Sequence, residues 1–239
     1  RQLYLNQWTE QDTRWLRMDH WAQGNPACPV DLVGRECFAG LDLATTFDTT
    51  ALVLLFPLDD GTFWVEPHFW IPNENATQRE RRDKVPYLTW QRQGHLTMTD
   101  GNVTDFEHVR RDINNLASKY RIRGIGLDPW NSAQLGQQLQ GDGLQMQDFR
   151  QGYGSLSAPS KQLENWVVAG KLRHGGHPVL AWQASNVAIQ TDSAAGNIKP
   201  SKAKSTERID GIVSLVMAIG LWQTATAPPP EQSWDIVAI

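Results

Sequence analysis

The stretch C-F-A-G-L-D-L-A-T-T-F-D-T-T-A-L-V-L-L-F-P, residues 37–57, decides the fold. Apolar residues fill two short runs, 37–43 and 50–57, and a threonine-rich segment with Asp48 lies between them. A third run, 62–71, follows a turn at Asp59-Asp60-Gly61. Short β-rich runs joined by short turns are typical of neighbouring antiparallel strands. The sequence therefore predicts a three-stranded antiparallel meander.

The residues after this meander alternate between helical and strand patterns. The expected elements are a charged helix over 75–84, helices over 103–120 and 132–140, and strands over 122–128 and 144–149. A helix over 160–169, a hairpin over 186–202 and an apolar helix over 206–222 complete the order. We expect an α/β fold in which one mixed sheet, with the meander and parallel strands, is flanked by helices.

The composition restricts the class of protein. The 239 residues are 40% hydrophobic and 20% charged, which is ordinary for a globular domain, and no apolar run reaches the roughly 20 residues that span a bilayer. A net charge of −4 argues against a protein that coats nucleic acid by charge alone. Cys28 and Cys37 lack zinc spacing and are expected to be reduced and buried. The eleven tryptophans are scattered, which favours core packing over base stacking.

Three aspartates occupy positions where a charge is costly. Asp42 and Asp128 end predicted strands, and Asp210 is expected inside the apolar last helix, with Arg208 as a nearby cation. A buried carboxylate normally pairs with a cation or binds a metal. Oxygen ligands without His or Cys favour Mg²⁺ or Mn²⁺. The three together therefore favour a metal site.

Each aspartate also has a structural interpretation. Asp42 and Asp128 are suited to capping turns or helices, and Asp210 in a first helical turn would gain about 0.3–1 kcal/mol from the helix dipole. Asp48 is as well suited to stabilising its turn as to binding metal. His174 and His177 lie in a Gly-rich turn without a third ligand nearby and are interpreted as structural.

Three motifs resemble the acidic motifs of the large terminase subunit of tailed bacteriophages, in its C-terminal nuclease domain. They are Gly40-Leu41-Asp42-Leu43-Ala44 with Asp48, Gly126-Leu127-Asp128-Pro129-Trp130-Asn131, and Arg208-Ile209-Asp210-Gly211-Ile212-Val213. Similar stretches lie between them at 151–153, 171–176 and 197–200, and the resemblance covers residues 1–222. The ordered combination is more specific than any single motif.

The resemblance implies a ribonuclease H-like, metal-dependent DNA endonuclease. Asp42, Asp128 and Asp210 would be catalytic and hold two Mg²⁺ or Mn²⁺ ions, with Asp48 as a weaker ligand. In such a site one ion activates the attacking water and the other stabilises the leaving 3′-oxygen. The implied substrate is concatemeric double-stranded DNA, cut during genome packaging in the cytoplasm of the infected bacterial host.

Two basic clusters offer contacts for the phosphate backbone of DNA. Lys199, Lys202, Lys204 and Arg208 approach Asp210 and are predicted to bind DNA. The cluster over 79–84 is interpreted as an ordinary solvated surface.

The expected organisation has three parts. Residues 1–30 are interpreted as a linker from a missing N-terminal ATPase domain, 31–225 as the nuclease domain and 226–239 as a C-terminal tail. The small terminase subunit and the portal are inferred partners, and no membrane association is expected. Because the fold supports several functions, a Holliday-junction resolvase-like nuclease and a catalytically silent docking module of the packaging motor stay as alternatives.

Overall fold

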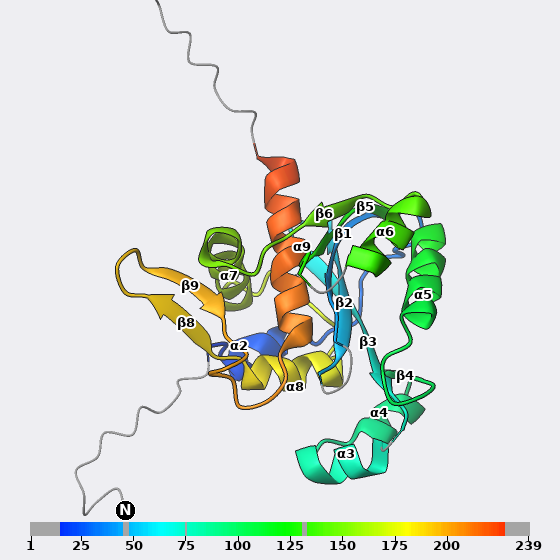
Figure 1. Cartoon of the computed structure of the whole chain (residues 1–239). Coiled ribbons are helices and arrows are strands. Elements are labelled where there is room, and N and C mark those ends of the chain that lie inside the picture. Colours follow the sequence, from blue (N-terminus) through cyan, green and yellow to red (C-terminus); the bar gives the residue numbers. More distant parts are fainter. Residues whose placement is uncertain (1–14, 45–47, 75, 131–132, 228–239) are drawn as a thin grey trace, which may run out of the picture.

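The computed structural model describes residues 15–44, 48–74, 76–130 and 133–227. Its main sheet has seven strands, with β4-β3-β2-β1-β5-β6 in that order and β7 paired with β3 (Figure 1). The strands are β1 Glu36–Asp42, β2 Thr50–Pro57, β3 Phe63–Pro72, β4 Thr97–Thr99, β5 Arg121–Leu127, β6 Met146–Asp148 and β7 Leu172–Arg173. A separate hairpin pairs β8 Ile189–Asp192 with β9 Asn197–Pro200.

Strand direction changes in the middle of the sheet. The first three strands pair antiparallel, which confirms the predicted meander. β5 then pairs parallel to β1, and β6 parallel to β5. The predicted mixed sheet is confirmed, and the parallel pairing brings the carboxyl ends of β1, β5 and β6 to one edge.

Helices cover both faces of this sheet, as Figure 1 shows. The described helices of four or more residues are α2 Met18–Trp21, α3 Ala76–Asp83, α4 Tyr87–Arg92, α5 Phe106–Lys119, α6 Ala133–Gly141, α7 Tyr153–Val168, α8 Pro178–Asn186 and α9 Asp210–Thr226. A 3₁₀ turn, η1, covers Ala22–Gly24. One buried cluster joins α7, α8 and α9 to one sheet face, and another joins α5 and α6 to the other.

The alternation of side chains along β1 determines which residues face each layer. Cys37, Ala39 and Leu41 pack in the α5–α6 cluster. The alternate positions 38, 40 and 42 therefore point to the α9 face, because successive side chains of a strand alternate. Asp42 is the last of these positions, so the pleat directs its carboxylate toward α9.

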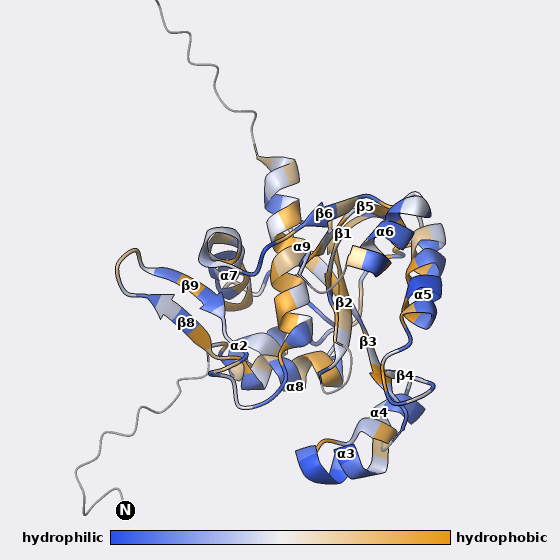
Figure 2. Cartoon of the chain, viewed as in Figure 1, coloured by the Kyte–Doolittle hydropathy of each residue, from blue (hydrophilic) through white to orange (hydrophobic). Residues whose placement is uncertain are grey.

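α9 lies close against β1 and is apolar nearly all round, as the colouring in Figure 2 shows. The approach is close enough that a Cβ added at Gly40 would collide with the backbone carbonyl of Ser214. Ser214 Oγ also donates a hydrogen bond of 2.9 Å to the carbonyl of Ala51. The absence of a side chain at Gly40 therefore allows α9 to pack closely against β1.

Three predicted helix starts are wrong. α5 begins at Phe106 instead of 103, because the Asp105 side chain caps it by accepting hydrogen bonds from the backbone N–H groups of Glu107 and His108. α9 begins at Asp210 instead of 206, because Ser205 donates backbone and side-chain hydrogen bonds to the Ser201 carbonyl and holds this segment in a turn. α7 begins at Tyr153 instead of 160, with Pro159 inside it. Pro159 is buried and lies beside Gly220 of α9, so tertiary packing outweighs the hydrogen bond that its missing N–H removes.

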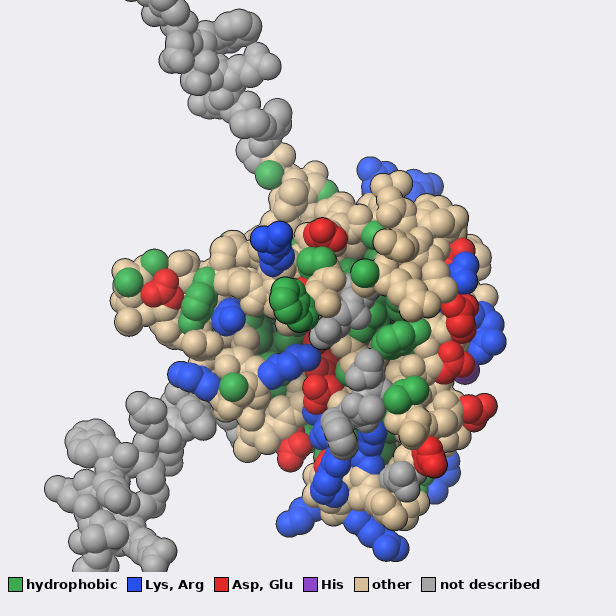
Figure 3. Space-filling view, in the orientation of Figure 1, with side chains coloured by type: hydrophobic (Ala, Val, Ile, Leu, Met, Phe, Trp, Pro, Cys, Tyr) green, Lys and Arg blue, Asp and Glu red, His purple; other side chains and the backbone are tan. Residues whose placement is uncertain are grey.

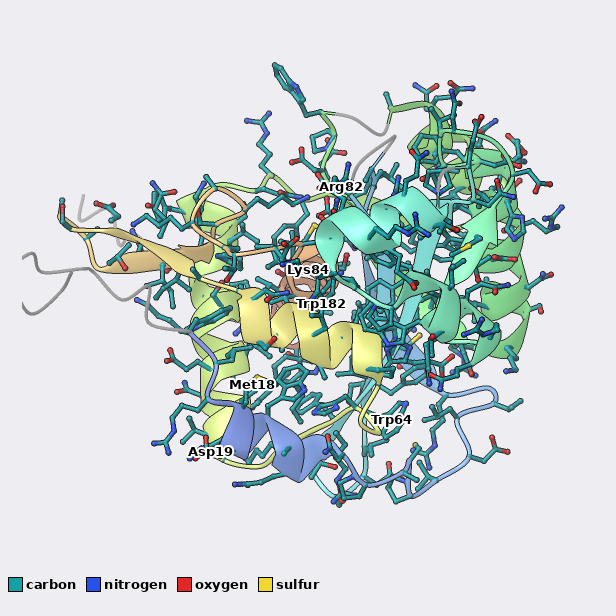
Figure 4. All side chains as sticks on the ribbon, turned by 90° about the horizontal axis from the view of Figure 1, so that it is seen from below. Met18, Asp19, Trp64, Arg82, Lys84 and Trp182 are labelled. Atoms are coloured by element: carbon teal, nitrogen blue, oxygen red, sulfur yellow. The ribbon has the colours of Figure 1, made fainter. Side chains whose placement is uncertain are left out.

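Sequence patterns also missed α4, β4, β7 and α8. Trp182, labelled on α8 in Figure 4, contacts the rings of Tyr87 and Trp90 of α4, with centroids 6.4 and 5.7 Å apart. The two short strands β4 and β7 pair with β3. All four elements are thus held by contacts between segments distant in sequence, which periodicity does not reveal.

The N-terminal and cysteine predictions are partly addressed by the described residues. Trp15, Leu16 and Trp21 are buried in the core cluster of the α9 face. Residues 1–14 of the predicted linker and 228–239 of the predicted tail lie outside the described residues.

Both cysteines are free, but Cys28 is only half-buried. Within the described ranges, the helices are too short or too polar to cross a membrane.

The two histidines of the Gly-rich turn have structural contacts. His174 is buried and stacks on Trp21, with ring centroids 4.4 Å apart. His177 accepts a hydrogen bond from the backbone N–H of Leu180 and caps α8. Burial lowers the pKa of both imidazoles, which keeps them neutral.

Candidate active site

Two of the three predicted catalytic aspartates meet where β1 ends and α9 begins. Asp42 is the last residue of β1 and Asp210 the first of α9. Their side chains are 8% and 1% exposed. Asp42 and Asp210 lie near each other because the pleat of β1 points Asp42 toward α9 and because Gly40 allows this helix to pack closely on the strand.

Each carboxylate uses one oxygen in a hydrogen bond from the protein. Asp42 Oδ1 accepts a bond of 3.2 Å from the Gln151 side-chain amide. Asp210 Oδ2 accepts one of 3.1 Å from the backbone N–H of Thr49. These bonds fix both carboxylates and leave Asp42 Oδ2 and Asp210 Oδ1 directed at a common position.

The ammonium of Lys202 occupies that common position. Its Nζ lies 2.9 Å from Asp42 Oδ2 and 2.7 Å from Asp210 Oδ1. The sequence placed Arg208 near Asp210, whereas the cation that lies between Asp210 and Asp42 in the structure is Lys202. Burial alone would lower the pKa of Lys202, but the two carboxylates raise it, so the side chain stays charged.

The pKa of Asp210 is raised, whereas the pKa of a carboxylate paired with a cation is usually lowered. Burial raises its pKa, Lys202 opposes this rise, and the nearby charges of Asp42 and Asp48 add to it. Two buried carboxylates at one place repel each other unless a cation lies between them. The geometry therefore creates a strong requirement for positive charge.

Asp128, the third predicted acid, lies at the same sheet edge without joining this cluster. The register pairs Leu41 with Leu127, so Asp42 and Asp128 follow at neighbouring positions of parallel strands. Asp128 Oδ1 accepts a hydrogen bond of 3.1 Å from the backbone N–H of Trp130. Within the part of the chain that the structure describes, no three His, Cys, Asp or Glu side chains are grouped closely enough to hold a metal.

Asp48 and Arg208 line a pocket of about 280 Å³ beside the aspartate pair, together with Lys202 and Asp210. Arg208 Nη1 lies 3.0 Å from Asp83 Oδ2, and its Nε lies 3.9 Å from Asp48 Oδ1. Both side chains of the Arg208–Asp83 pair are nearly buried. This ion pair connects the segment before α9 to the end of α3.

The other two predicted DNA-binding residues, Lys199 and Lys204, lie on β9 and just after it, which is called the hairpin side of the site. Lys199 Nζ donates to the Gln151 carbonyl at 3.4 Å and lies 5.1 Å from the centroid of the Tyr153 ring. Lys204 is exposed. Figure 3 shows acidic side chains near the middle of this face with lysine and arginine side chains on either side.

The basic cluster at 79–84 is only partly the solvated surface that was expected. Arg79 is 9% exposed, and burial lowers its pKa. Arg82 pairs with Asp83 at 2.6 Å, and Lys84 has a positive φ of 54°. Figure 4 shows Arg82 and Lys84 at the end of α3.

A comparison with known protein families identifies the family of this chain. The sequence model of the family "Terminase large subunit, endonuclease domain" matches residues 2–226. The chain belongs to this family. The resemblance found in the motifs is thereby confirmed.

The similar proteins agree with this assignment. The terminase large subunit of Enterobacteria phage HK97 is 37% identical over 203 residues, which cover 84% of this chain and 40% of that protein. The crystal structure of the HK97 large terminase matches with a TM-score of 0.81 and 33% identity, over 87% of this chain and 43% of that one. The present chain thus spans less than half the length of its HK97 relative.

More distant structures share the fold. The large terminase nuclease from thermophilic phage G20c matches with a TM-score of 0.53 and 12% identity, over 81% of this chain and 90% of that one. The same nuclease has been crystallised with bound magnesium. The predicted ribonuclease H-like fold is confirmed by these terminase nuclease neighbours.

In this terminase endonuclease domain, sequence reasoning missed two contacts of the site. Gln151 orients Asp42, and its only signal was the family-like stretch at 151–153. Lys202 was predicted to bind DNA, but no local pattern placed its ammonium between two aspartates. The contacts of Gln151 and Lys202 with Asp42 join residues far apart in the sequence, and a turn separates Lys202 from Asp210.

Proposed function

We propose that this chain is a divalent-metal-dependent endonuclease domain that cuts concatemeric double-stranded DNA during genome packaging by two-metal-ion hydrolysis. The observation that carries the proposal is the pair of buried oxygens, Asp42 Oδ2 and Asp210 Oδ1, converging on one cation. The family assignment supports the nuclease part of this proposal.

The donor set fits a hard divalent ion. The converging atoms are carboxylate oxygens, and the buried Asp42 Oδ2 has the Lys202 ammonium as its partner. The Lys202 ammonium stands in for a cation there, at 2.9 and 2.7 Å, whereas Mg²⁺ binds oxygens at about 2.0–2.1 Å. A metal would therefore displace this ammonium. The magnesium-bound structure of the G20c nuclease is consistent with the proposed metal class.

The four aspartates have different proposed roles. Asp42 and Asp210 would hold the first ion, since their oxygens already converge. Asp128, which follows β5 beside Asp42 on the adjacent parallel strand, would contribute to the second position. Asp48, which lines the adjoining pocket, is the weaker ligand. When bound, the ions would supply the charge that activates the attacking water and stabilises the leaving 3′-oxygen.

The protein's own residues would position the reacting groups. Gln151 and the Thr49 N–H keep the two carboxylates oriented. Lys199, Lys204 and Arg208 would contact phosphates on the hairpin side, and Lys202 would join them once displaced. Phosphate contacts of this kind set the register of DNA without reading its sequence.

The whole protein would extend this activity into a packaging motor. The chain spans 40% of the HK97 large subunit, which leaves room for the proposed N-terminal ATPase domain. The small terminase subunit and the portal are proposed partners, and the proposed place of action is the cytoplasm of the infected bacterium.

Cleavage of supercoiled plasmid tests the proposal. The chain should nick and linearise plasmid in Mn²⁺ or Mg²⁺ and not in EDTA, and Asp42→Asn should lose at least about a hundredfold in rate, since a catalytic metal supplies several kcal/mol. Asp59→Asn, at a side chain 87% exposed and outside the site, is the matched control.

Each alternative predicts a different result. Cleavage by Asp42→Asn at the parent rate would reject the proposed site. Preference for a four-way junction over linear duplex would favour a resolvase, and no cleavage in either metal would favour a docking module.

A further inference from the structure

Trp130 departs from the packing of the other described tryptophans. Its side chain is 89% exposed, whereas Trp15, Trp21, Trp70 and Trp90 are each at most 7% exposed. The other large exposed hydrophobics among the described residues are all valines. The exposed indole presents a large flat apolar face with a polar N–H, which suits it to stacking on a ligand.

The backbone holds Trp130 beside the proposed metal ligands. Its N–H donates to Asp128 Oδ1 at 3.1 Å, and Pro129 restricts the backbone between the two residues. The turn directly follows β5, whose neighbour β1 ends at Asp42. The indole is therefore displayed two residues from a proposed ligand at the catalytic edge of the sheet.

An arginine, Arg150, follows β6 at the same edge of the sheet. β5 and β6 pair with Leu127 opposite Asp148, and the Phe149 N–H bonds to the Leu127 carbonyl at 2.9 Å. Arg150 follows and is exposed. Its neighbour Gln151 donates to Asp42. An aromatic side chain and an arginine thus follow the ends of the adjacent strands β5 and β6, at the sheet edge where Asp42 ends β1.

We propose that Trp130 and Arg150 bind one strand of the DNA next to the scissile phosphate. Trp130 stacks on a nucleobase and Arg150 contacts a backbone phosphate, a combination that proteins use for single-stranded segments. Because the face of a base is covered in an intact duplex, the bound DNA is locally unstacked there. The inference rests on the proposed nuclease function and adds that the enzyme engages an opened base.

Binding without cleavage tests this proposal. The probe is a duplex with 2-aminopurine at a central mismatch, titrated in Ca²⁺ with the parent chain, Trp130→Ala and Trp130→Phe. The parent should change the 2-aminopurine fluorescence. Trp130→Ala should abolish that change and weaken binding at least about fivefold, whereas Trp130→Phe, which keeps an aromatic face, should stay within about twofold.

Arg150→Gln tests the phosphate contact separately. It should reduce the slope of log affinity against log salt by about 0.9, the value for one lost phosphate contact. Val103→Ala and Arg81→Gln, both at exposed positions outside the site, are the controls. Thermal unfolding of each variant should match the parent, because these side chains are exposed.

The outcomes separate this inference from the proposed function. Parent-like affinity and fluorescence in Trp130→Ala, or no DNA binding by the parent, would overturn the stacking contact. If the parent binds with the expected fluorescence change but does not cleave plasmid in any metal, the nuclease proposal fails and the stacking contact stands.

Discussion

Lys202 Nζ lies 2.7 Å from Asp210 Oδ1, so the lysine that follows the β8–β9 hairpin neutralises the first residue of α9. The same ammonium reaches Asp42 at 2.9 Å. A side chain of the protein therefore satisfies the charge requirement of the site without a metal. If the proposed metal uses the same oxygens, Lys202 and the metal compete for them.

Replacing Lys202 by methionine tests this competition. Lys202→Met should bind Mn²⁺ about tenfold more tightly, because no ammonium has to leave, and the chain should lose about 1–3 kcal/mol of stability without metal, the cost of leaving buried acceptors unpaired. Titration calorimetry and urea unfolding measure the two effects. Lys204→Met, at an exposed neighbour, is the control. Weaker Mn²⁺ binding in Lys202→Met would show that the lysine does not compete.

The Arg208–Asp83 ion pair should contribute to stability. The two side chains are 11% and 6% exposed, and Asp83 also pairs with Arg82, so losing the Arg208 contact should cost about 1.5–3 kcal/mol, the range for a hydrogen bond to a charged group. Arg208→Gln should therefore lower the free energy of unfolding by that amount in urea denaturation. Arg81→Gln, an exposed substitution on the same helix as Asp83, should change it by less than about 0.5 kcal/mol. Equal stability of the two variants would reject the structural role.

Gly40 should be intolerant of a side chain. Gly40→Ala directs a methyl group at the Ser214 carbonyl, and such overpacking costs about 1–3 kcal/mol. Gly154→Ala is the matched control, because a Cβ there meets open space within α7 and should be neutral or stabilising by roughly 0.5 kcal/mol. Thermal unfolding distinguishes the two. A Gly40→Ala chain as stable as the parent would contradict the close packing of α9 on β1.

The lysines on the hairpin side should contribute to DNA affinity through phosphates. Lys199→Gln with Lys204→Gln should reduce the slope of log affinity against log salt by about 1.8, the value expected for two lost contacts. Lys161→Gln with Lys171→Gln changes the net charge equally at exposed positions elsewhere. Fluorescence anisotropy in Ca²⁺ at several salt concentrations measures both slopes. The same slope in both double variants would remove the two lysines from the DNA contact.

The sequence predicts the longer strands of the sheet well because their signals are local, although it missed the short strands β4 and β7. β2 covers Thr50–Pro57 as predicted, and β1, β3 and β5 are shifted by about one residue. Each is an apolar run bounded by a turn, so neighbouring residues contain the information. Asp42 and Asp128 were recognisable for the same reason, as acids that follow apolar strands.

The features that depend on contacts between distant segments were not predictable. Asp210 was placed inside α9 but begins it, because Ser201 and Ser205 hold the preceding segment in a turn. The Lys202 bridge requires β1, the hairpin and α9 to be assembled. The exposure of Trp130 was equally invisible, since a tryptophan in sequence gives no sign of whether it is buried.

Anomalous diffraction from crystals grown in Mn²⁺ tests the central claim most directly. The account predicts a manganese peak about 2 Å from both Asp42 Oδ2 and Asp210 Oδ1, with the Lys202 ammonium moved away from its position between them. No peak at these oxygens, with Lys202 still 2.7–2.9 Å from both, would contradict the claim that the aspartate pair is a metal site.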